Sequence, residues 1–145
     1  MKTFIKRSAL ALMALLMLAM SVFVSTRKTE AATTYNNATD ADLSASISSN
    51  GLLNVSLSVM GIKGITTRIE TALYVEKRIL GLFWKRVNIG CTDNVWYDST
   101  TNIYYNSVFS HSLSSGGTYR ITVTYTVSGS GGASDIITMT NTVTY

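Results

Sequence analysis

The chain has 145 residues, of which 46% are hydrophobic and 14% are charged, and its formal net charge is +4. Five of the 12 basic residues but only one of the eight acidic residues lie within residues 1–32, which leaves seven of each in the rest of the chain. The net charge of the rest of the chain is therefore about zero and does not by itself favour binding to nucleic acid or to an anionic membrane. Only a local cluster of basic residues could favour such binding. We expect no nucleic-acid partner.

Residues 1–32 have the layout of a secretory signal peptide. Basic residues precede an apolar run over 9–24, and small residues follow at Ala31 and Ala32. As a helix the run spans about 24 Å, which is shorter than the ~30 Å hydrocarbon core of a membrane. We therefore predict cleavage near residue 32 and a secreted, extracellular protein; an uncleaved membrane anchor is the alternative.

The rest of the chain suits one domain that buries about two thirds of its extended-chain surface. Cys91 is the only cysteine, so an exported form has no internal disulfide. We interpret Cys91 as a partly buried, small apolar residue, with a reactive or intermolecular thiol as the alternative.

Residues 33–41 are polar and rich in turn formers, and we predict a flexible lead-in there. Apolar and polar residues then alternate with a period of two through 42–145, as they do in half-buried strands. Turn signals such as Asn50-Gly51 separate the alternating segments, which are 43–47, 53–59, 69–76, 83–89, 103–113, 119–127 and 136–143. In the last segment we expect the inward-facing residues to be Ile137, Met139 and Val143.

About seven short strands, with turn signals roughly every 8 to 12 residues, predict an all-β antiparallel two-sheet sandwich. Tyr119 follows the pair Gly116-Gly117 and begins a long strand. Immunoglobulin-like and fibronectin-like sandwiches use such a tyrosine to tie a connection between the sheets through its hydroxyl. We therefore predict a sandwich of this kind over 42–145, with Tyr119 at a structural corner.

Residues 65–89 fit two structures. As a helix, their apolar face beside basic residues would suggest binding at a membrane surface. As a hairpin that turns at Gly81, they would place Glu76 near Lys85 or Arg86, and opposite charges across a ladder contribute a few tenths of a kcal/mol. We predict the hairpin, because a helix would be foreign to an otherwise all-β chain.

Three motifs resemble a family of small secreted bacterial proteins: Glu76-Lys77, Gly81-x-x-Trp84-Lys85 and Gly117-Thr-Tyr-Arg120, followed by a threonine-rich last strand. The similarity covers roughly 42–145. It implies secretion and a single β-sandwich domain of unassigned function, and it supplies no catalytic residues. The chain departs from the family at the hairpin tip, which is usually polar there but apolar here.

Chemistry-bearing residues are sparse. His111 is the only histidine, and neither it nor Cys91 lies in a motif that would activate a nucleophile pair. Oxygen-bearing residues in the loop 93–102 could hold Ca²⁺, but the EF-hand spacing is missing and these residues are ordinary turn formers. We predict a non-enzymatic protein with no catalytic residue, metal or cofactor.

Aromatic residues near the same loop offer a second candidate. Trp96 and Tyr97, with polar neighbours, could stack on a sugar and bond its hydroxyls. This would make the protein a carbohydrate-binding module. The alternative is that Trp96 and two of the nearby tyrosines are core or strand-face residues.

The segment 77–86 holds the third candidate, an apolar tip between basic pairs. The apolar residues are Ile79, Leu80, Leu82 and Phe83, and the basic residues are Lys77, Arg78, Lys85 and Arg86. An exposed apolar patch usually marks a partner or membrane contact, although a neighbouring loop could cover it. We predict a binding module that contacts an unknown protein or cell-surface partner through this tip. The alternative is a membrane-active or toxin-like factor that uses the same tip.

Overall fold

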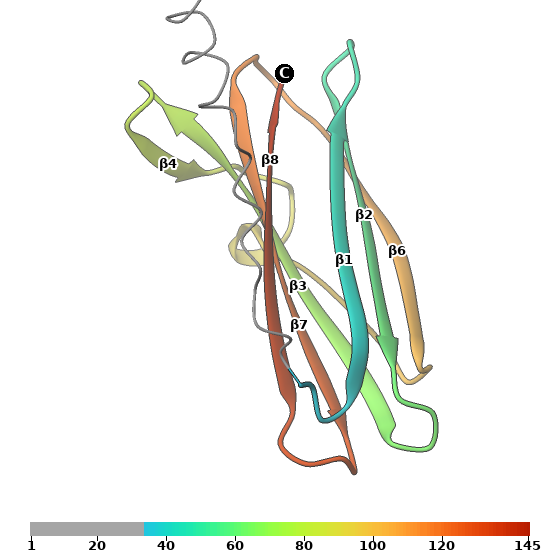
Figure 1. Cartoon of the computed structure of the whole chain (residues 1–145). Coiled ribbons are helices and arrows are strands. Elements are labelled where there is room, and N and C mark those ends of the chain that lie inside the picture. Colours follow the sequence, from blue (N-terminus) through green and yellow to red (C-terminus); the bar gives the residue numbers. More distant parts are fainter. Residues whose placement is uncertain (1–33) are drawn as a thin grey trace, which may run out of the picture. The chain divides into compact units, whose positions relative to one another are not determined.

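The computed structural model describes residues 34–145, in which eight strands form two antiparallel sheets (Figure 1). The predicted signal peptide over 1–32 lies outside these residues. The elements in chain order are β1 (Ala38–Ile47), β2 (Leu52–Gly61), β3 (Thr66–Ile79), β4 (Phe83–Arg86), a short 3-10 turn (Thr92–Asn94), β5 (Trp96–Thr100), β6 (Tyr104–Ser112), β7 (Thr118–Gly129) and β8 (Asp135–Thr144).

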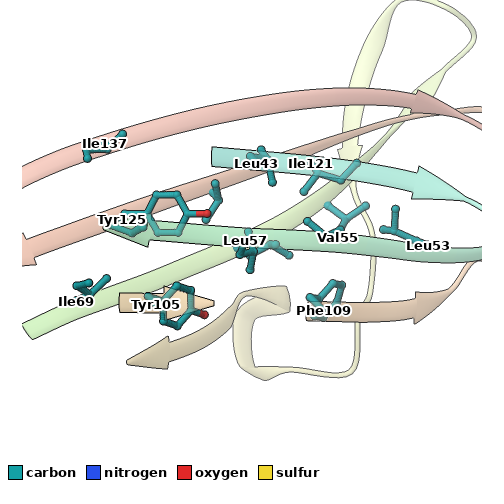
Figure 2. Close-up of a cluster of buried hydrophobic side chains, with 14 of the residues drawn as sticks. Leu43, Leu53, Val55, Leu57, Ile69, Tyr105, Phe109, Ile121, Tyr125 and Ile137 are labelled. Atoms are coloured by element: carbon teal, nitrogen blue, oxygen red, sulfur yellow. The ribbon is translucent and has the colours of Figure 1, made fainter. Parts of the chain in front are cut away.

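The smaller sheet has the strand order β1-β2-β6, and the larger has the order β4-β3-β7-β8, with β5 also paired to β3. One face of each sheet turns inward, and the two faces share a single apolar core (Figure 2). The predicted all-β architecture with two antiparallel sheets is confirmed. Side chains that are wholly buried in the core include Leu53, Val55, Ile69, Leu73, Val75, Ile121, Val123, Tyr125 and Val127.

The edge of β3 explains where the strand pattern differs from expectation. β4 pairs with Glu76–Ile79, and β5, which replaces part of an expected loop, pairs with Ile69–Leu73. Because both short strands use one edge of β3, the chain has to leave that edge between them. β4 therefore ends at Arg86 rather than at Ile89, and the buried Ile89 owes its apolar character to packing rather than to strand pairing.

Residues 65–89 form the hairpin and not the alternative helix. Glu76 lies opposite Arg86, as expected from a turn at Gly81. The predicted ion pair across the hairpin is nevertheless wrong, because Glu76 pairs with Arg120 of β7 on its other side. Nε and Nη2 of Arg120 both donate to one Glu76 carboxylate oxygen, at 2.9 and 2.7 Å.

The predicted flexible lead-in over 33–41 is wrong from Asn36 onward. β1 begins at Ala38, and the carboxylate of Asp135 at the start of β8 accepts three consecutive backbone N–H groups. These come from Asn36, Asn37 and Ala38, at 2.8, 2.7 and 2.9 Å. The polar residues that resemble a loop are ordered by a buried acid nearly a hundred positions away, which local sequence patterns do not reveal.

Replacing Asp135 by Ala should lower the free energy of unfolding by about 3 kcal/mol, because buried N–H donors would lose a charged acceptor. Asp135→Asn keeps one acceptor oxygen and should cost less. Urea unfolding of both variants measures this. A loss below about 1 kcal/mol in Asp135→Ala would show that the carboxylate does not anchor β1.

Tyr105 and Tyr125 meet in the buried core, with ring centroids 6.3 Å apart in an edge-to-face arrangement. The Tyr125 hydroxyl donates to the Asp42 carbonyl at 3.0 Å, and the Tyr105 hydroxyl donates to Asp98 Oδ2 at 3.1 Å. Desolvation by burial is the main cause that raises the pKa of both hydroxyls above their usual value of 10.0. The neutral hydroxyls are thus favoured by the folded state.

Alkaline pH should consequently destabilise the protein. Because the folded pKa values are raised, the stabilisation is complete below pH 10 and is lost as pH rises above it, at no more than about 1.4 kcal/mol per pH unit for each tyrosine. Tyr125→Phe removes one of the two contributions, so its free energy of unfolding should fall less steeply than that of wild type. Urea titrations between pH 8 and 11 measure the slopes, and equal slopes would contradict this assignment.

Candidate hairpin-tip contact site

The turn between β3 and β4 holds a leucine, Leu80, in a left-handed backbone conformation. Leu80 and Gly81 both have positive φ angles, 51° and 70°, and Leu82 N donates to Ile79 O at 3.0 Å. Two successive left-handed residues match the twist of a hairpin, and Asn, Asp or Gly normally occupies them. A leucine in this conformation costs roughly 1–2 kcal/mol.

The side chains at this turn lie in solvent. Leu80 is 84% exposed, Leu82 is 81% exposed and Phe83 is 53% exposed, whereas Ile79 is half-buried. Figure 1 shows the β3–β4 hairpin, in yellow-green, extending away from the strands of the smaller sheet. We call Leu80, Leu82 and Phe83 the apolar tip. Within residues 34–145 no neighbouring loop covers its two leucines. They therefore add little to the core, while the conformation of Leu80 strains the turn.

The four predicted basic residues lie on the hairpin but divide between its two faces. Arg78 lies opposite Trp84 and Arg86 lies opposite Glu76, all on the outer face of the larger sheet. Lys77 and Lys85 are paired with each other on the other face. The basic cluster expected from the sequence is therefore two separate rows.

A third arginine joins the outer row from β7, and we call Arg78, Arg86 and Arg120 the arginine row. Each guanidinium lies over an aromatic ring: Arg86 over Tyr74 with its Cζ 3.6 Å from the centroid, and Arg120 and Arg78 over Trp84 at 4.4 and 5.9 Å. Stacking of this kind orients the guanidinium groups and leaves their edges free to bond. Sequence reasoning missed Arg120, because only the β3–β7 register brings it here. It also missed Tyr74, which lies two residues before Glu76 on β3 and meets Arg86 through the hairpin register.

Lys77 faces the structural corner rather than the tip. Its Nζ lies 2.6 Å from Ser115 Oγ and 5.6 Å from the centroid of the Tyr119 ring. The Tyr119 hydroxyl donates to the Ser115 carbonyl, in the connection that leads from β6 in one sheet to β7 in the other. Lys77 thus packs on the inter-sheet connection, while Lys85 remains exposed.

The structure does not assemble the predicted sugar-stacking pair. Trp96 and Tyr97 are neighbours on β5, so their side chains point to opposite faces. Trp96 is half-buried against the core, with its ring centroid 5.6 Å from that of Phe109, whereas Tyr97 is 68% exposed on the outer face. Of the predicted sugar-stacking pair, Tyr97 alone is exposed.

Cys91 and His111, the other residues that could carry out chemistry, pack against side chains of the fold. Cys91 packs against the core, and the His111 ring stacks on Phe109 with centroids 6.4 Å apart. Within residues 34–145, no group of three or more histidine, cysteine or acidic residues is placed to hold a metal ion. The same residues include no helix long and apolar enough to cross a membrane.

Exchanging Leu80 for Asn should maintain the free energy of unfolding or raise it by up to about 1 kcal/mol, because Asn accepts the left-handed conformation and no buried surface is lost. Leu57→Ala in the core is the contrasting control and should cost about 3 kcal/mol. Chemical denaturation measures both. A clear destabilisation by Leu80→Asn would show that Leu80 packs against the fold.

No model of a known protein family matches the chain, and no curated protein is similar enough to match it. The family resemblance drawn from the motifs at 76–85 and 117–120 therefore stays a prediction. The chemistry of the hairpin itself is the available guide to function: an exposed apolar tip followed by ordered arginines.

Proposed function

We propose that the protein is a secreted, non-enzymatic binding module that contacts its partner through the apolar tip and the arginine row. The observation that carries the proposal is the state of Leu80, which is 84% exposed and has a positive φ angle. Neither packing nor backbone geometry favours leucine at that position. A strained, exposed apolar residue of this kind supports a role in binding.

Secretion and an immunoglobulin-like sandwich belong to the same proposal. The layout of residues 1–32 supports export, and the absence of a cysteine pair is compatible with a core that needs no disulfide. The Tyr119 hydroxyl bond to the connection between the sheets supports the immunoglobulin-like assignment.

A non-enzymatic role is supported by the structural use of the polar residues. Asp98 accepts the Tyr105 hydroxyl, and Asp135 accepts the backbone of the first strand. His111 stacks on an aromatic ring. These groups already have partners within the fold, whereas the two leucines of the apolar tip pack against no other element in the described part of the chain.

The composition of the hairpin suits a contact of modest size. Burying an exposed leucine is favourable by roughly 1.5–3 kcal/mol, so Leu80 and Leu82 together could supply much of a micromolar affinity. Aromatic residues and arginine are enriched among the residues that dominate binding energy. Phe83, Trp84 and the arginine row place such groups directly behind the leucines.

Labelled protein added to intact cells of the producing organism tests this role. Wild type should bind saturably, and the double variant Leu80→Asn/Leu82→Ser should bind about tenfold more weakly or worse, because its tip has lost two apolar side chains. Ile136→Ser is the matched control, since Ile136 is 72% exposed on β8 and lies away from the hairpin.

The control should bind like wild type. Equal binding by the tip variant and wild type would remove the tip as the contact site. Absence of any saturable binding by wild type would overturn the proposed function as a whole.

A further inference from the structure

We propose, building on the function proposed above, that the partner of the hairpin is the surface of an anionic lipid bilayer. The apolar tip would enter the boundary between headgroups and acyl chains, while the basic residues behind it would meet lipid phosphates. Three features favour a bilayer over a protein surface. They are the charge distribution of the domain, the depth at which its basic residues would lie, and the shape of the hairpin tip.

Positive charge is concentrated at the hairpin. Of the seven basic residues in 33–145, five lie on the hairpin or directly beside it, together with one acid, Glu76; the five are Lys77, Arg78, Lys85, Arg86 and Arg120. This gives the hairpin region a net charge of +4, and two basic against six acidic residues give the remainder −4. Such a separation orients the tip toward an anionic surface even though the domain is neutral.

Most of this charge is available to a ligand. Within residues 34–145 the ion pairs are Arg68–Glu70 and Arg120–Glu76. Arg78 and Arg86 therefore have no carboxylate partner there, and their stacked guanidinium groups can present paired N–H donors to a phosphate.

The order of residues along the hairpin matches the layers of a membrane interface. A strand rises about 3.3 Å per residue, so Arg78 and Lys85 lie about 7–10 Å behind the turn. Interfacial segments insert their apolar face to about 5–10 Å. Insertion of Leu80 and Leu82 would thus bring these charges to phosphate depth, with Trp84 at the interfacial level that tryptophan prefers.

The shape of the site favours a bilayer over a folded protein. A stable protein interface buries about 800 Å² on each partner, with close complementarity. The three apolar side chains of the tip lie on and directly after a turn of only three residues, 80–82, and offer little flat surface for such an interface. A bilayer needs no preformed groove, because lipids rearrange around a convex apolar insertion.

Co-sedimentation with vesicles tests the proposal. Wild type should pellet with phosphatidylcholine vesicles that contain about one third phosphatidylglycerol at low salt, and less with phosphatidylcholine alone or at about 1 M salt. Leu80→Asn/Leu82→Ser should weaken binding about tenfold, and Arg78→Gln and Lys85→Gln about fivefold each. Ile136→Ser should leave binding unchanged.

Fluorescence provides a second readout that does not depend on pelleting. The chain has two tryptophans, so Trp96→Phe leaves Trp84 as the only reporter. Its emission should shift to the blue on addition of anionic vesicles and remain unchanged with neutral ones.

If wild type fails to pellet and the Trp84 emission of Trp96→Phe does not shift with anionic vesicles, the lipid proposal is overturned. If cell binding nevertheless requires the tip and is abolished by protease treatment of the cells, the partner is a protein and the proposed function stands without the lipid. If binding to cells and vesicles is equally absent, both proposals fail. Equal pelleting of wild type and of Leu80→Asn/Leu82→Ser would also refute the lipid proposal.

Discussion

The antiparallel pairing of β3 with β7 is the interaction on which the rest of this structure depends. It places the wholly buried Leu73 and Val75 beside Val123 and Ile121 in the middle of the larger sheet. The pairing ends at Lys77 and Tyr119, but β3 continues to Ile79. Beyond that point β4 is the one described strand that still pairs with β3, so the hairpin leaves the body of the sandwich and its tip lies in solvent.

The same register assembles the arginine row from three strands. Glu76 has Arg86 opposite it on one side and Arg120 on the other, and it bonds the second. Arg86 is left to stack on Tyr74, and Trp84 receives Arg120 on its ring. One acid among three guanidinium groups orders the row without neutralising it, which suits a surface that attracts anions.

The hairpin was predictable from the sequence because its evidence is local. Alternation on both sides of Gly81 indicates two strands, and two strands joined by a short turn can pair only as neighbours. Whether Leu80 is exposed was left open by the sequence, since a neighbouring loop could have covered the tip. The roles of Lys77 and Arg120 were not predictable, since they depend on which strand lies next to β3, and loop lengths do not specify that neighbour.

By itself, the sequence determined the all-β class, the position of most strands and the residues of the tip, because a period-two pattern encodes which side chains face a core. Only the tertiary structure decided that Asp135 anchors the start of β1, that Trp96 and Tyr97 face apart, and that the basic residues form two rows. The physical reason is sequence separation: contacts such as Asn37 to Asp135 join residues that no local pattern relates, and they form only once both sheets are in register.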